Sequence, residues 1–242
     1  MLRELLKGGE WSDLLDLVSP SFFDVLRPRD LQREVRRLTT NYVRRHSFDQ
    51  ARQRLQRHLR DVRVPIRLGV EIASGTSGPN PQQRGQWLLE LFFRQLLHAD
   101  EALLDLRFDR FGEQGEELVW NPRPLFARWD ADFLDTLRKL YVGYYEDDPS
   151  SFRSALDRLG LRCAEEIFAA QFARGRQQSV AFRLSDFRRT FHDTFVRCRD
   201  CGATLHGGFV PFGIYLAFLY EHLERLGGEH DVIRAYRASR SV

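Results

Sequence analysis

Hydrophobic residues recur with helical spacing along most of this chain. Residues three and four positions apart lie on the same face of a helix, so such spacing predicts amphipathic helices. We expect one helix to begin near Arg29 and a second near Ala51, with a short earlier helix over Ser12–Val18 that ends before Pro20. The apolar positions of the two longer helices are Leu31, Val35, Leu38, Tyr42 and Val43, then Ala51, Leu55, Leu59 and Val62.

The pattern changes over Val64–Ile72, where β-branched residues in rough alternation predict a strand. Gly75–Gly78 follows it, in the position of a phosphate-binding loop, but it has neither the GxGxxG nor the Walker spacing. We therefore interpret it as a plain connecting loop. Asn80 and Pro81 then supply a capping side chain and a proline at the first helical position, which predicts a helix to about Leu97.

A β-hairpin is predicted next. The apolar runs LLDLRF and ELVW flank Gly112–Gly115, a glycine-bearing loop of hairpin length, so we expect the hairpin to span about Leu103–Trp120. From Asp130 onward the pattern is helical, with helix starts at Asp148 and Ser185. The latter segment is preceded by a short candidate strand, Ser179–Phe182.

The last long helix, Gly207–Leu226, is apolar nearly all round, and such helices are buried. Its longest apolar stretch, Phe209–Tyr220, is shorter than the roughly 20 residues that cross a bilayer. The predicted order is helices, a strand, a helix, a hairpin and then only helices. A doubly wound sheet requires strands and helices that alternate along the chain, so this order excludes it. We expect a mainly α fold with a small β-hairpin, in one domain over 1–242: a basic helical segment (1–63), a strand-helix-hairpin segment (64–128) and a helical bundle (129–242).

Charge is distributed unevenly along the 242 residues, although the net charge is only +3. The segment Arg27–Arg67 has thirteen arginines against four acidic residues, a surplus of +9 that leaves −6 elsewhere. We interpret this segment as a solvated helix face. The alternative is a binding face for an anionic membrane or nucleic acid, whose candidate residues are Arg33, Arg36, Arg37, Arg44 and Arg45.

The cysteine count is three, which is sparse and odd, and this favours reduced thiols in a cytosol-like compartment. The N-terminus does not resemble a signal peptide. We thus expect a cytoplasmic protein, with peripheral membrane contact as the alternative. Cys198 and Cys201 form a CxxC, and His192 and His206 lie near enough in sequence to complete a zinc site. Because Cys198 falls on an amphipathic helix, we interpret the cysteines as structural and predict no zinc, with zinc and a redox pair as alternatives.

His98-Ala99-Asp100 ends one predicted helix and leads into the predicted hairpin, as the catalytic loop does in protein-kinase-like folds. Together with three other stretches, it resembles the UbiB/AarF atypical kinase-like family over about residues 25–238. The four stretches are SFDQARQRLQRHLRDVRVP, EIASG, FFRQLLHAD and the closing segment that begins FHDTFVRCRD. The resemblance implies a reduced kinase-like helical lobe and a link to isoprenoid-quinone or other lipid metabolism.

The chain departs from that family at its catalytic positions. The family loop continues Pro-His-Pro-Gly-Asn, whereas this chain has Glu101–Asp105, so Asp105 falls at the metal-binding Asn. Asn121 is the nearest counterpart of the Asp in the family's Asp-Phe-Gly triplet. The family's lysine-bearing strand, alanine-rich nucleotide loop and KxGQ segment have no counterpart.

With those parts missing, the resemblance implies a pseudokinase-like accessory or binding protein without a cofactor, acting on an unknown protein or lipid partner. The alternative is a residual ATPase or phosphotransferase. It would bind ATP and magnesium through Asp105 and Asn121, with His98 and Asp100 as its catalytic candidates.

Overall fold

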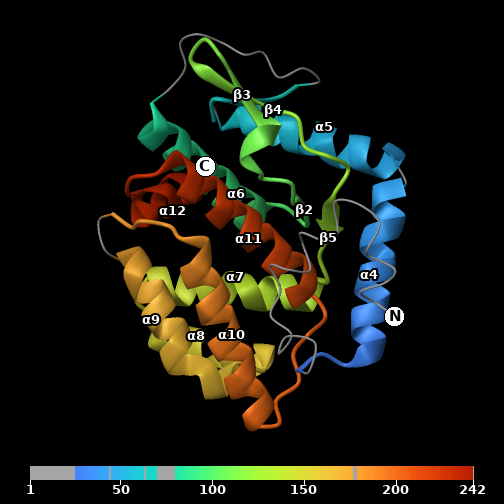
Figure 1. The fold of residues 1–242 in the computed structure, drawn as a ribbon, viewed down its shortest axis with the longest axis vertical. Coiled ribbons are helices and arrows are strands. Elements are labelled where there is room, and N and C mark those ends of the chain that lie inside the picture. The colour runs from blue at the N-terminus through green and yellow to red at the C-terminus, as the bar shows by residue number, and fades with distance from the viewer. Residues whose placement is uncertain (1–24, 44, 63, 70–79, 177–178, 242) are drawn as a thin grey trace.

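The computed structural model describes residues 25–43, 45–62, 64–69, 80–176 and 179–241, and only the backbone within 41–45 and 171–176. The predictions for Ser12–Val18 and Gly75–Gly78 lie outside these residues. Most of the described chain is helical, with a few short strands (Figure 1), which confirms the predicted mainly α fold with a small β part.

Two helices, α4 (Pro28–Val43) and α5 (Arg45–Asp61), confirm the amphipathic pattern near the N-terminus. Leu31 and Leu38 of α4 are buried, as are Leu55 and Leu59 of α5, because each pair lies on the apolar face. In Figure 1, α4 runs along one side of the molecule and α5 crosses over the strands. Arg33, Arg36 and Arg57 are exposed on the outer faces of these helices, whereas Arg52 is half-buried and donates to the Gly69 carbonyl oxygen.

In the part of the chain that the structure describes, five short strands form two small sheets. In the larger sheet β4 (Glu117–Trp120) lies between β3 (Phe111–Gln114), which is antiparallel to it, and β1 (Ile66–Leu68), which is parallel. The second sheet pairs β2 (Glu101–Leu103) with β5 (Phe126–Arg128) in antiparallel fashion. Both sheets lie beside α5 (Figure 1).

The predicted hairpin exists, but its first arm is β3 rather than LLDLRF, and its turn is at Gly115-Glu116 rather than Gly112–Gly115. Gly115 has a φ of 62°, which glycine adopts without strain, whereas Gly112 pairs with Val119 inside the strand. Leu103 and Leu104 are buried in the core and do not pair with β4, so their apolar pattern reflects burial rather than a hairpin arm. The strand predicted over Val64–Ile72 is confined to Ile66–Leu68 in the described residues.

Helix α6 (Pro81–His98) lies at the centre of the fold and begins as predicted. The side chain of Asn80 accepts a hydrogen bond from the Gln83 backbone N–H at 2.8 Å, and Pro81 occupies the first helical position. Helix α6 contacts α7 (Ala131–Tyr145), α11 (Phe209–Leu226) and α12 (Val232–Arg240). It joins the strand region to the C-terminal helices.

The C-terminal helices confirm most of the predicted boundaries. Asp130 and Asp148 cap α7 and α8, and Gly160 ends α8 with a φ of 76°. The candidate strand over Ser179–Phe182 was wrong, because only a single bridge joins Val180 to His230. The remaining helices are α8 (Pro149–Leu159), α9 (Glu165–Arg176) and α10 (Leu184–Asp200), with short 3-10 turns η1 (Phe108–Arg110) and η2 (Arg162–Ala164).

Helix α11 is buried over most of its circumference, as predicted, and Tyr215 is fully enclosed. Buried residues of the N-terminal helices, the strands and the C-terminal helices form one continuous core cluster. Among the described residues, no helix combines the length and apolarity needed to cross a membrane.

Candidate functional site

His98 and Asp100 lie on a cleft of about 550 Å³ between α5 and the end of α6, which we name the polar cleft. Helix α5 contributes Arg54 and His58, and β2 contributes Glu101. The structure therefore brings the two residues predicted from the His-x-Asp motif to one opening, and it adds His58, which the sequence analysis missed.

Charges on the polar cleft are largely paired within the protein. Arg54 contacts Glu101 at 2.5 Å (Nη2 to Oε1), and Arg128 approaches the other Glu101 oxygen at 3.7 Å. The Asp100 side chain is 93% exposed, and its nearest cation is Arg138 at 3.8 Å. The carboxylate of Asp100 is hence hydrated, and water screens such pairs strongly.

The imidazoles of His58 and His98 face each other with ring centroids 5.8 Å apart. His98 Nε2 donates to the Ser239 carbonyl oxygen at 2.7 Å, while His58 Nε2 is buried without a hydrogen-bond partner. Burial lowers the pKa of His58, and the neighbouring His98 and Arg94 lower it further. None of the described lining residues is a serine, threonine or cysteine, so the described lining of the polar cleft offers no hydroxyl or thiol nucleophile of these types.

Asp105 lies apart from the polar cleft and is fully buried at the base of the hairpin. Arg107 binds it through two contacts, Nε to Oδ1 at 2.6 Å and Nη2 to Oδ2 at 3.0 Å. The Arg123 backbone N–H donates to Oδ2 at 2.9 Å, and Arg110 Nε lies 3.5 Å from the same oxygen. We name these four residues the Asp105 cluster.

Asp105 in turn stabilises the charged form of Arg107. Burial alone would lower the pKa of Arg107, but the hydrogen bonds and charge of Asp105 raise it overall. Both Asp105 oxygens thus already accept protein donors in a site closed to solvent, and a metal ion would have to displace an arginine to reach them.

Asn121 lies close to this cluster, since its backbone N–H donates to the Arg110 carbonyl oxygen at 2.9 Å. The structure consequently brings Asp105 and Asn121 to one region and leaves Asp100 on the polar cleft. Over the described residues, no group of three or more His, Cys, Asp or Glu side chains is arranged to hold a metal ion.

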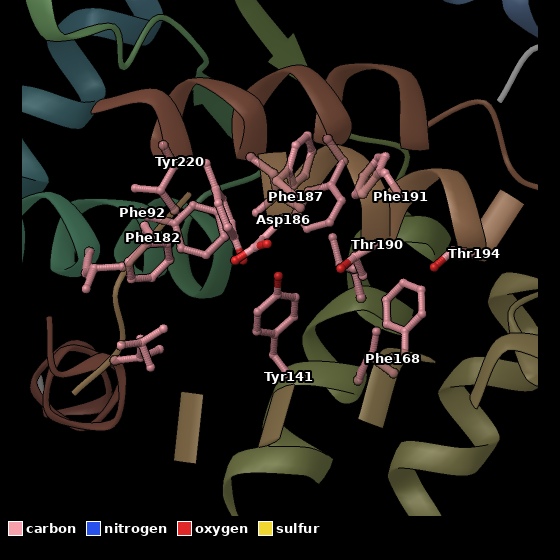
Figure 2. A pocket seen from close by; sticks show the side chains of 18 of the residues that line it. Phe92, Tyr141, Phe168, Phe182, Asp186, Phe187, Thr190, Phe191, Thr194 and Tyr220 are labelled. Carbon is pink, nitrogen blue, oxygen red and sulfur yellow. The ribbon is translucent and has the colours of Figure 1, made fainter. Parts of the chain in front are cut away.

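A second opening, which we name the aromatic cavity, has a volume of about 120 Å³ and lies among α6, α7, α10 and α11 (Figure 2). Its walls are dominated by aromatic and aliphatic side chains. Phe182 meets Tyr220 at a centroid distance of 4.9 Å, and Phe187 meets Phe191 at 4.3 Å. Contacting rings at such distances stabilise each other beyond the burial of their area.

The aromatic cavity has few polar groups, of which Asp186 lies at its edge and Tyr141 is buried. Figure 2 shows the Asp186 carboxylate and the Tyr141 hydroxyl pointing toward one another, with Thr190 beside them. Burial raises the pKa of Tyr141 well above its ordinary value, so its hydroxyl is neutral. Asp186 accepts a hydrogen bond from Arg189 Nη2 at 2.7 Å, and its side chain remains 24% exposed. The cavity therefore offers an apolar interior with a few hydrogen-bonding groups.

The three cysteines come together, whereas the two histidines predicted beside them do not. Cys163 Sγ lies 4.0 Å from Cys198 Sγ, and Cys201 hydrogen-bonds with Cys163. His192 is exposed on α10, and His206 stacks on Phe133 with centroids 5.0 Å apart. We name Cys163, Cys198 and Cys201 the thiol cluster.

The predicted basic face of α4 is partly neutralised by acidic residues of the same helix. Arg33 lies 2.9 Å from Asp30, and Arg37 lies 3.7 Å from Glu34. Arg36 is exposed, and the side chains of the two remaining predicted residues, Arg44 and Arg45, lie outside the described residues. Local pairing of this kind weakens the attraction of a helix for polyanions.

No protein-family model matches the chain, and no curated protein or solved structure matches it.

Proposed function

We propose that this chain is a non-catalytic binding protein that holds a small apolar ligand in the aromatic cavity. The observation that carries the proposal is the cavity itself, an apolar opening with the Asp186 carboxylate at its edge and the buried Tyr141 hydroxyl pointing toward that carboxylate. Small-molecule sites are typically concave and mostly apolar, with a few polar groups that orient the ligand.

The size of the cavity restricts the ligand class. An apolar protein cavity of about 150 Å³ binds benzene, so a volume of about 120 Å³ suits one small ring or one branched five-carbon unit. A methyl-substituted ring with a hydroxyl or carbonyl group would bury its apolar part and place its oxygen near Tyr141. This chemistry is compatible with the link to isoprenoid quinones or lipids that the UbiB/AarF resemblance implies.

The Asp105 cluster supports the non-catalytic part of the proposal. Phosphoryl transfer needs magnesium held by carboxylate or amide oxygens beside the phosphates. Asp105 is enclosed by arginine donors, and Asp100, the second acidic candidate, lies on a separate cleft. These positions favour binding over a residual ATPase or phosphotransferase.

Saturation-transfer NMR with toluene and 4-methylphenol tests the proposal, with glucose as a polar control. We expect both aromatic probes to receive saturation from the wild-type protein. Thr190→Phe places a ring in the cavity and should abolish the signal. Asp193→Phe adds the same ring to an exposed position of α10 outside the cavity, and it should leave the signal unchanged. No signal in the wild type, or equal signals in the two variants, would contradict the proposal.

A further inference from the structure

Three thiols from two separate parts of the sequence meet where η2 packs on the end of α10. Cys163 belongs to η2, Cys198 to the last turn of α10, and Cys201 is the residue that ends that helix. We infer that Cys163 and Cys201 are a redox modification site, at which a hydroperoxide oxidises the two thiols to a reversible disulfide.

Cys163 adjoins both of the other thiols. Its Sγ lies 4.0 Å from Cys198 Sγ, and its side chain hydrogen-bonds with that of Cys201, which makes Cys201 the second possible partner for a bridge. All three cysteines are free. A disulfide needs the sulfur atoms to approach to about 2.05 Å, and the hydrogen-bonded thiols of Cys163 and Cys201 are the pair from which it would form.

Exposure selects the pair. Cys201 is exposed at the end of α10, Cys163 is half-buried behind it, and Cys198 is fully buried. Burial, with the nearby Cys163, raises the pKa of Cys198 to about 12. A hydroperoxide therefore reaches Cys201 first, whereas Cys198 is shielded. The hydrogen bond with Cys163 raises the pKa of Cys201 as well, so exposure and not ionisation selects Cys201.

The reaction balances in two steps. The Cys201 thiolate attacks one peroxide oxygen, an S–O bond forms, the O–O bond breaks, and hydroxide leaves and is protonated to water. The resulting sulfenic acid carries the two-electron oxidation, and the peroxide is reduced. The Cys163 thiolate then attacks the sulfenic sulfur, the S–S bond forms, and the second hydroxide leaves. In total, two thiols and one hydrogen peroxide give one disulfide and two waters.

The bridge would close a loop between η2 and the end of α10, and closing such a loop restricts the unfolded chain. We expect the oxidised protein to unfold at a temperature roughly 5–10 °C higher than the reduced protein. A thiol reductant should reverse the shift.

The test treats the reduced full-length chain with hydrogen peroxide and measures its intact mass and its disulfide-linked peptides. We expect the loss of two hydrogen atoms, a linked Cys163–Cys201 peptide pair, and full reversal by dithiothreitol. Cys201→Ser and Cys163→Ser should abolish the bridge, and Cys198→Ser, the matched control, should keep it.

Peptide mapping of the wild type keeps the proposal testable if Cys198→Ser fails to fold. Addition of oxygen atoms at Cys201 without a bridge, a Cys163–Cys198 pair, or a bridge between two chains would each overturn the assignment.

Discussion

The Asp105 cluster and the aromatic cavity place a carboxylate in opposite settings. Asp105 is fully buried, and its oxygens accept hydrogen bonds from Arg107 and the Arg123 backbone. Asp186 lies at the edge of an apolar opening and stays partly exposed beside Arg189. A carboxylate enclosed by fixed cations contributes to the fold, whereas one at the rim of a cavity remains accessible to a ligand. We therefore assign binding to the cavity rather than to Asp105, the magnesium candidate of the alternative ATPase hypothesis.

Among the substitutions that test this comparison, we expect Asp105→Ala to lower the free energy of unfolding most. Removing one partner of a buried ion pair leaves an uncompensated charge and costs about 3–5 kcal/mol. Chemical denaturation should show that loss in the free energy of unfolding. The matched control is Asp109→Ala, which removes an exposed carboxylate 3.3 Å from Arg110 and should cost less than about 1 kcal/mol. Equal losses in the two variants would remove the structural role assigned to Asp105.

Phe218→Ala tests the core that supports both regions. Phe218 is 4% exposed on α11, and its ring lies beneath the Arg107 guanidinium at 5.1 Å. Truncating a buried phenylalanine should lower the free energy of unfolding by about 3–5 kcal/mol, which thermal or chemical denaturation measures. An unchanged midpoint would place this part of α11 on the surface.

The stability of the protein should fall as the pH falls below 6.5, in part through His222. Burial, with the charge of Arg84, lowers its pKa to about 3 in the folded protein, where its Nδ1–H donates to the Leu106 carbonyl oxygen at 2.8 Å. Since the unfolded histidine has a pKa of about 6.5, it binds a proton that the folded one does not, and this costs about 2 kcal/mol at pH 5.

His222→Asn keeps a donor near the Leu106 carbonyl and removes the titration. The drop in stability between pH 7 and pH 5 should therefore be smaller in His222→Asn than in the wild type. His192→Asn, at an exposed position of α10, should retain the full pH dependence. If the stability of His222→Asn falls between pH 7 and pH 5 as much as that of the wild type, the buried neutral imidazole is not the cause of the pH dependence.

Asn80→Ala should have the smallest effect. It removes the side chain that accepts a hydrogen bond from the Gln83 N–H at the start of α6, and loss of such a cap costs about 1 kcal/mol. Asn80→Asp retains the accepting oxygen and should restore the stability. If Asn80→Asp lowers the stability as much as Asn80→Ala does, the side-chain cap is not the interaction that stabilises the start of α6.

Local signals explain which parts of the fold were predictable. Asn80 and Pro81 specify a helix start within two residues, and Gly160 and Gly227 end helices for a similarly local reason. The first hairpin arm was misplaced because Leu103, Leu104 and Leu106 are buried, and buried positions outside a hairpin are as apolar as those of a hairpin strand. The pattern of apolar residues indicates that these positions are buried, but it does not indicate which segment packs against them.

The candidate sites were less predictable because distant segments form them. Cys163 reaches Cys198 across 35 residues, and no local pattern indicates that contact. His58 joins His98 in the same way. The aromatic residues of α10, including Phe187 and Phe191, have the spacing of an ordinary buried stripe, so the opening among them becomes visible only when the other helices are in place.

Thermal denaturation in the presence of 4-methylphenol or of magnesium and ATP tests the central claim most directly. A ligand at 100-fold above its dissociation constant stabilises a fold by about 2.7 kcal/mol, which raises the midpoint of a chain of this size by roughly 5–10 °C. We predict such a rise with 4-methylphenol, its loss in Thr190→Phe, and no rise with magnesium and ATP. A rise with magnesium and ATP that disappears in Asp105→Asn, with none from 4-methylphenol, would contradict the account.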